Sequence, residues 1–223
     1  MKKQANNDPQ KVFNLFTDKV RSNFVRDEMD ENQISYLFEY ALEQGIDINK
    51  QNQYGDTFLL LAIENNVNKE TLEAIIQKGA KTDIGDINGL TPLHLAAVSK
   101  SNTCDKINLF VTKDNINIKD KHGRTPLMFA VVRSICSPEV YELLLSKGAN
   151  IDEKNNYGST PLHQAVGDQS LDLVKFLVLK KADINAQDSS SRTPLDIAKK
   201  HIEDGHKGVF IDIKIFLESC ANQ

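Results

Sequence analysis

Gly89-Leu90-Thr91-Pro92-Leu93-His94-Leu95-Ala96-Ala97 is the stretch of this sequence that decides the fold. Its central phrase, Thr-Pro-Leu-His, returns in altered forms that begin at Thr57, Thr125, Thr160 and Thr193. The five threonines are 33 to 35 residues apart, and a glycine stands two residues before four of them. Ser191 takes the place of that glycine before the fifth threonine. A phrase repeated at this period predicts a stack of similar helical hairpins, each of which contacts only its neighbours.

The segment 120–154 shows how one copy is built. Asp120-Lys121-His122-Gly123 predicts a turn, because Asp supplies a side-chain acceptor and Gly supplies backbone freedom. Thr125 is placed to cap a first helix, and Pro126 occupies its first position, where a missing N–H costs nothing. A second helix is expected to begin at Pro138 and to end at Gly148 in a left-handed cap.

Over about residues 33–220, the chain resembles the ankyrin-repeat proteins in the phrase, its period and the glycine before it. The resemblance implies an all-α solenoid of stacked helix-turn-helix units with β-turn fingers. It also implies that His94 and His163 form structural hydrogen bonds to backbone groups between repeats. We expect a single domain over 1–223, divided into an N-terminal helical cap or degenerate repeat 1–51, repeats 52–85, 86–119, 120–154 and 155–187, and a C-terminal capping repeat 188–223.

Three features of the repeats lead to further expectations. A small alanine recurs in each first helix and should let neighbouring helices approach closely: Ala62, Ala96, Ala130, Ala165 and Ala198. Lys113 and Lys181 stand where glycine ends the other second helices, so a left-handed conformation there would be strained. Residues 8–30 have apolar side chains at helical spacing, and they are either part of the N-terminal cap or a separate partner-binding helix.

Charge, cysteine content and the absence of signal patterns indicate the environment in which we expect the protein. The net charge of −4 over 223 residues is mild and mixed, which disfavours binding to nucleic acid or to an anionic membrane. Three scattered cysteines favour a reducing compartment over a disulfide scaffold. We find no signal-peptide pattern and no apolar run of membrane-spanning length, and we expect a cytoplasmic protein, in the host-cell cytoplasm if it is exported.

The sequence offers no pattern of catalytic or ligand-binding chemistry. It has no nucleophile elbow, no phosphate-binding glycine loop and no HExxH helix. His201 and His206 are five residues apart, a spacing that does not place both on one helical face, so a solvated loop is favoured over a metal site. We therefore expect a protein that is not an enzyme and has no catalytic residues, cofactor or metal.

The residues around each glycine slot and at the end of each first helix form the predicted partner surface, a concave groove in the family that the chain resembles. Three of the five arginines and two of the five tyrosines fall there, and both residue types are enriched at binding hot spots. The predicted contact residues are Tyr54, Asp56, Ile87, Leu90, Val98, His122, Arg124, Arg133, Tyr157, Asp168 and Arg192. The N-terminal half of this set is apolar and the C-terminal half is basic, which suits an extended protein segment with apolar and then acidic residues.

The sequence favours a monomeric protein–protein interaction module that binds through this groove as a host-directed effector, adaptor or competitive inhibitor. Two alternatives stay open. One is an inhibitory or regulatory subunit of an enzyme encoded by a neighbouring gene. The other is lysine-mediated binding to nucleic acid or to a lipid surface, which the mixed charge disfavours.

Overall fold

The computed structural model describes residues 31–43, 45–99, 103–133 and 137–221, without the side chains of residues 31, 33, 132 and 133. These residues form helices and connecting turns, with no β-strand among them, as the all-α solenoid class requires. The chain divides into two compact units, residues 1–110 and 111–223. The apolar helix predicted within residues 8–30 lies outside the described residues.

The first unit contains α3 (Glu31–Glu43), α4 (Phe58–Glu64), α5 (Lys69–Gln77), α6 (Pro92–Ala96) and α7 (Thr103–Phe110). The second unit contains α8 (Pro126–Arg133), α9 (Pro138–Ser146), α10 (Pro161–Gly167), α11 (Leu171–Leu179), α12 (Pro194–Glu203) and α13 (Val209–Ala221).

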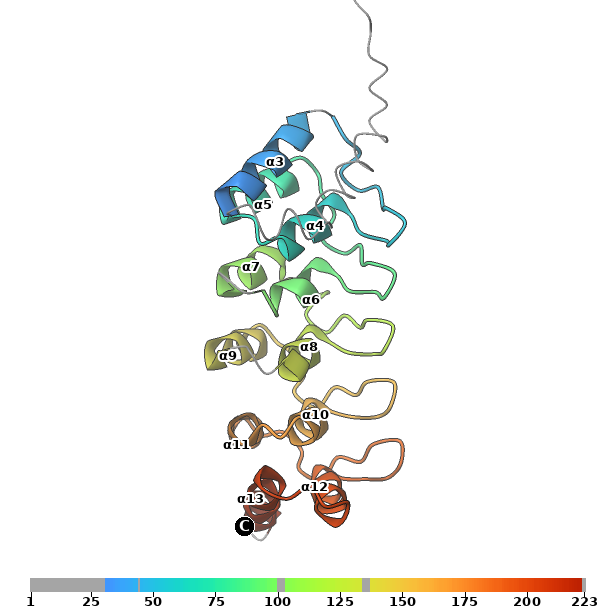
Figure 1. Cartoon of the computed structure of the whole chain (residues 1–223), viewed down its shortest axis with the longest axis vertical. Coiled ribbons are helices and arrows are strands. Elements are labelled where there is room, and N and C mark those ends of the chain that lie inside the picture. The colour runs from blue at the N-terminus through green and yellow to red at the C-terminus, as the bar shows by residue number, and fades with distance from the viewer. Residues whose placement is uncertain (1–30, 44, 100–102, 134–136, 222–223) are drawn as a thin grey trace, which may run out of the picture. The chain divides into compact units, whose positions relative to one another are not determined.

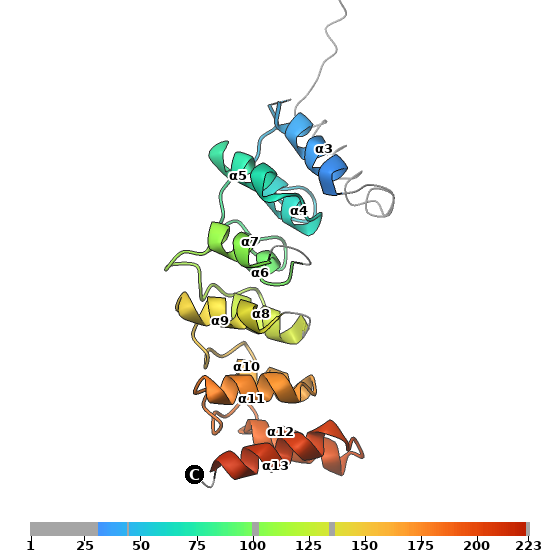
Figure 2. The same ribbon diagram turned by 90° about the vertical axis from the view of Figure 1, so that its left-hand side faces the viewer.

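Within each unit the helices form two rows, as Figure 1 shows. In the first unit α4 and α6 lie beside the projecting turns, and α3, α5 and α7 form the outer row. In the second unit α8, α10 and α12 lie beside the turns, and α9, α11 and α13 form the outer row. Figure 2, turned by 90°, shows the outer helices of the second unit stacked one after another.

Each inner helix begins at the threonine of the repeated phrase. The hydroxyl oxygens of Thr57, Thr125 and Thr193 accept hydrogen bonds from the backbone N–H three residues later, at 3.2–3.3 Å. These bonds satisfy N–H groups that have no partner inside the helix. Proline occupies the first position of α6, α8, α10 and α12, so the predicted helix starts are confirmed.

The small alanines of the inner helices lie in the core, as the sequence predicted. Ala62, Ala96, Ala130, Ala165 and Ala198 are completely buried. Larger apolar side chains surround them, and the leucines of the repeated phrase at 93, 127 and 162 are also completely buried. Since each hairpin packs its apolar face on the next one, the core of each unit is built repeat by repeat.

The outer helices end as expected at glycine, and the structure distinguishes the two lysines that replace it. Gly45, Gly79 and Gly148 have φ of +70°, +92° and +99°. Lys181 adopts the same left-handed region with φ of +73°, at a cost of about 1 kcal/mol relative to glycine. Lys113 does not adopt the left-handed region, so the condition for strain is met at Lys181 and not at Lys113.

Candidate partner-binding surface

A repeated hydrogen-bond pattern shapes the turn before each inner helix, which we call a finger. In the finger of residues 120–124, Asp120 Oδ1 accepts the backbone N–H groups of His122 and Arg124, both at 2.8 Å. The fingers that begin at Asn52, Asp86, Asn155 and Asp188 have the same two bonds, at 2.8–3.0 Å. Asp and Asn favour such turns because their short side chains reach backbone N–H groups two residues on.

Successive fingers within a unit are joined through their backbones. In the second unit the N–H of Asn156 donates to the carbonyl of His122 at 3.0 Å, and the N–H of Ser189 donates to the carbonyl of Tyr157 at 2.9 Å. In the first unit the N–H of Ile87 donates to the carbonyl of Tyr54 at 3.2 Å. The backbone at the finger tips is therefore held in place by a bonded scaffold, which fixes where each tip side chain begins.

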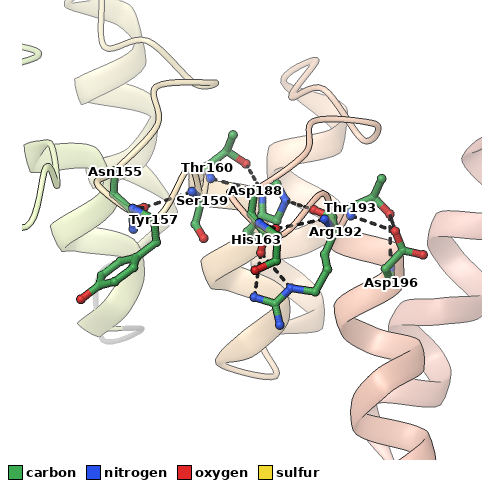
Figure 3. A network of polar contacts seen from close by, with 10 residues as sticks. Asn155, Tyr157, Ser159, Thr160, His163, Asp188, Arg192, Thr193 and Asp196 are labelled. Atoms are coloured by element: carbon green, nitrogen blue, oxygen red, sulfur yellow. Dashed lines mark hydrogen bonds and ion pairs between the residues drawn. The ribbon is translucent and has the colours of Figure 1, made fainter.

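The histidine of the repeated phrase connects a finger to the next repeat. His163 Nε2 lies 2.9 Å from the carbonyl oxygen of Arg192, which can only accept, so Nε2 carries the proton. Nδ1 then accepts the backbone N–H of Thr160 at 3.2 Å, and this bond completes the cap of α10 (Figure 3). Burial lowers the pKa of His163, and the bond to the Arg192 carbonyl opposes that shift. The structural role expected for His163 is thus confirmed.

Three of the five fingers expose a large tyrosine or isoleucine side chain. The side chain of Tyr157 is 65% exposed and points away from the polar network beneath it (Figure 3). In the first unit Tyr54 is 41% exposed and Ile87, on the next finger, is 53% exposed. His122 is also exposed, whereas Leu90 and Val98 are half-buried. Large apolar and aromatic surface at fixed tips provides contact area that the core does not need.

The finger arginines are held by the aspartates of their own fingers. Arg124 donates from Nε to Asp120 Oδ2 at 2.7 Å, and its guanidinium lies 5.0 Å from the ring centre of Phe129. Arg192 donates from Nε and from a terminal nitrogen to Asp188 Oδ2, at 2.9 and 2.8 Å. Because each arginine is paired with an aspartate, the charges of the pair cancel. These fingers therefore offer oriented N–H donors and little positive potential.

The aspartate of the Arg192 pair illustrates how burial and hydrogen bonding compete. Burial of Asp188 alone would raise the pKa of its carboxyl group. The hydrogen bonds from the side chain and backbone of Arg192, together with the N–H of Ser190, outweigh burial and lower the pKa of Asp188. The carboxylate is therefore ionised at neutral pH and orients Arg192.

Three other predicted contact residues have different surroundings. Asp56 is 2% exposed, and its carboxylate accepts the amide of Asn52 at 3.0 Å, so it supports the finger and offers no contact surface. Asp168 lies at the end of α10 and is an exposed residue. Its carboxyl group is nevertheless partly shielded from solvent, which raises its pKa. Arg133 ends α8, and its side chain lies outside the described residues.

Two lysines that could have contributed to a cationic surface are instead hydrogen-bonded to the neighbouring repeat. Lys119 Nζ donates to the backbone carbonyl of Lys154 at 2.9 Å, and Lys154 Nζ donates to that of Gln187 at 2.8 Å. Lys119 also pairs with Glu153 at 2.8 Å, which lowers the pKa of that carboxyl group.

The histidine pair near the C-terminus has a packing role that the sequence did not predict. α12 continues through His201, so this histidine lies in a helix and not in a loop. Its ring stacks on Phe210 with 4.3 Å between ring centres and 6° between planes. Among the residues that the structure describes, no group of three or more His, Cys, Asp or Glu side chains is arranged to hold a metal ion.

A family model of ankyrin repeats in three copies matches four overlapping stretches, residues 29–107, 66–155, 97–188 and 136–210. This chain belongs to the ankyrin-repeat family. Ankyrin repeats are generally protein–protein interaction modules, and the family is typically non-enzymatic. Across the helices described for this ankyrin-repeat chain, none combines the length and the apolar character that crossing a membrane requires.

Proteins of animals and of viruses are among those similar to this chain. The chain is 25% identical over 177 residues to human transient receptor potential cation channel subfamily A member 1, covering 75% of this chain and 16% of the channel. It is 27% identical over 221 residues to a putative ankyrin repeat protein of Acanthamoeba polyphaga mimivirus, covering 92% of this chain and 27% of the viral protein. Human SH3 and multiple ankyrin repeat domains protein 2 is 28% identical over 203 residues, covering 91% of this chain and 11% of that protein. The chain thus spans about a quarter or less of these relatives.

Proposed function

We propose that this ankyrin-repeat chain binds a partner protein through its finger tips. The observation that carries the proposal is the side chain of Tyr157, which is 65% exposed on a finger whose backbone is bonded to both neighbouring fingers. A tyrosine on a bonded backbone gives a large contact area, and binding there needs no ordering of the main chain. Such a residue serves recognition better than it serves the stability of the stack.

The two units favour different chemistry in the partner. In the first unit Tyr54 and Ile87 form an apolar tip surface, which suits the apolar residues of an extended segment. In the second unit Tyr157 and Arg192 offer a phenol and a half-exposed guanidinium, which suit carboxylate or carbonyl oxygens. An extended segment with apolar and acidic residues meets both requirements.

A role as a host-directed effector, adaptor or competitive inhibitor is the finer form of this proposal. Its support is the similarity to the mimivirus protein over most of this chain. The free thiols of Cys104 and Cys220 are compatible with action in the reducing cytoplasm that this role requires.

The test is affinity capture from eukaryotic and bacterial lysates with matched variants. The binding variant is Tyr54→Ala/Tyr157→Ala, and the control is Leu179→Ala, which removes an even more exposed apolar side chain from the outer row. We expect the native chain and the control to recover the same protein and the binding variant to lose it, with unchanged circular dichroism in all three. Equal recovery by the folded binding variant would refute the finger-tip site.

A further inference from the structure

One face of α3 in the first unit is unlike the exposed faces of the other outer helices. Ile34, Phe38 and Ala41 are buried on the side toward the unit core. The opposite face carries two large aromatic side chains one turn apart, Tyr36 and Tyr40, which are 68% and 55% exposed. Residues four apart on a helix are neighbours, so the two rings lie on one surface.

The same face is acidic. Glu39 and Glu43 are both exposed beside the tyrosines, and the sequence of α3 contains no lysine or arginine. Glu39 Oε1 accepts the hydroxyl of Thr71 on α5 at 3.0 Å, which fixes one carboxylate at the edge of the tyrosine pair. We call the surface of Tyr36, Glu39, Tyr40 and Glu43 the α3 face.

The neighbouring helix does not neutralise these carboxylates. α5 carries a cation near its start, Lys69, which pairs with Glu73 of the same helix at 3.7 Å. Glu70 is also exposed on α5. Lys78, which caps the end of α5, is exposed as well. The described surface of α3 and α5 is therefore aromatic, with four carboxylates (Glu39, Glu43, Glu70 and Glu73) against two lysines (Lys69 and Lys78).

The aromatic pair is not required by the packing of the outer row. At the exposed positions of α9 the chain places Glu139 and Glu142, which are ordinary solvent-facing residues. Two exposed tyrosines bury little area in this fold and therefore contribute little to its stability. Their electron-rich ring faces attract cations, and carboxylates beside them form charge-assisted hydrogen bonds with ammonium or guanidinium groups.

We infer that the α3 face binds a lysine- or arginine-containing segment of a partner protein, with cationic side chains over Tyr36 and Tyr40 and ion pairs to Glu39 and Glu43. This site is separate from the proposed finger-tip site. In Figure 1, α3 packs in the outer row of its unit with α5, on the side away from the fingers of that unit. The two sites require opposite charges in their partners, so one protein could join two segments of different chemistry.

The test uses the full chain and two fluorescent peptides, one alternating lysine with serine and the other with glutamine in place of lysine. Fluorescence anisotropy at low salt should show binding of the lysine peptide and no binding of the glutamine peptide. Tyr36→Ala/Tyr40→Ala should weaken that binding about 5- to 30-fold, because two exposed cation–π contacts are removed. Tyr36→Phe/Tyr40→Phe keeps the rings and should stay within about twofold of the native chain.

A control variant separates this site from the fingers. Tyr157→Ala removes an equally exposed tyrosine from the second unit and should leave the affinity for the lysine peptide unchanged. The proposal fails if the alanine pair binds as well as the native chain, if Tyr157→Ala loses as much affinity, or if the phenylalanine pair loses as much as the alanine pair. It also fails if sedimentation shows self-association of the native chain that the alanine pair abolishes, since a second copy would then occupy the face. Circular dichroism confirms that each variant is folded.

Discussion

The repeat 155–187 and the repeat 188–223, neighbours in the second unit, use different residues at two equivalent positions. The slot two residues before the threonine holds Gly158 in one and Ser191 in the other, both left-handed, with φ of +72° and +59°. The fourth residue of the repeated phrase is His163 in one and Asp196 in the other. At both positions the residue of repeat 155–187 makes a close contact with the repeat that follows it.

The contacts explain the difference. A Cβ on Gly158 would lie 2.6 Å from the backbone nitrogen of Ser189 on the next finger, so this slot has no room for a side chain. His163 spans to the next repeat through the carbonyl of Arg192. Ser191 is exposed, and Asp196 lies on the surface, where its carboxylate accepts hydrogen bonds from the N–H and the hydroxyl of Thr193 at 2.9 and 2.8 Å. In the described part of the chain no further finger packs on residues 188–193, so the side chains of Ser191 and Asp196 face no later repeat.

The largest expected effect is that of Gly158→Ser, which places the residue of the later slot in the earlier one. The new side chain would collide with the next finger and adopt an unfavourable left-handed backbone. We expect a loss of about 2–4 kcal/mol in the free energy of unfolding, measured by urea denaturation followed by circular dichroism. A loss below about 0.5 kcal/mol would show that the fingers move apart without cost.

His163→Ala should have the next largest effect. It removes the bond to the Arg192 carbonyl, leaves the buried N–H of Thr160 without its acceptor, and opens a cavity. We expect a loss of about 2–3 kcal/mol in the free energy of unfolding. The matched change Asp196→Ala removes an exposed cap and should lose about 1 kcal/mol, so similar losses for the two variants would contradict the comparison.

The two caps should also respond to acid in different pH ranges. Burial lowers the pKa of folded His163, so the unfolded chain binds its proton more readily, and the stability that neutral His163 provides is lost as pH falls below about 6.5. Hydrogen bonds from the backbone and side chain of Thr193 lower the pKa of Asp196, so its contribution is lost only as pH falls below about 4.

Urea denaturation between pH 7.5 and 5.5 tests the histidine part of this prediction. His163→Met, which copies the residue found at Met128, should reduce the slope of stability against pH in that range. Asp196→Asn is the control and should leave the slope above pH 5.5 unchanged. An unchanged slope in His163→Met would assign the acid sensitivity to other groups.

The sequence predicted the repeated elements well, because each is determined by a local rule. The threonine caps, the buried alanines and the glycine helix ends all follow from the conformations that those residues favour. The binding surface was less predictable, because exposure depends on how neighbouring turns pack. Asp56 and Arg124 were expected to face a partner, but the aspartate is buried and the arginine is held by Asp120.

Other features depend on contacts between distant residues, which a single repeat cannot reveal. Lys106 is 2% exposed although lysine normally reaches solvent. Its ammonium group donates to Asn66 Oδ1 at 2.6 Å and to Ser99 Oγ at 2.8 Å, and Asn66 is positioned by its left-handed backbone. The tyrosine pair of α3 and the carboxylates beside it could have been predicted from their spacing along the helix, but only once the buried side of that helix was known.

The measurement that tests this account most directly is the comparison of Gly158→Ser with Ser191→Gly, each made singly in the full chain and unfolded in urea. Ser191→Gly relieves a left-handed serine but adds freedom to the unfolded chain, so we expect a change of less than about 1 kcal/mol, the smallest effect predicted here. Gly158→Ser should lose at least about 2 kcal/mol, because the adjoining finger leaves no space. If the two exchanges change stability by equal amounts, residue choice at this slot does not depend on the next repeat, and the account is wrong.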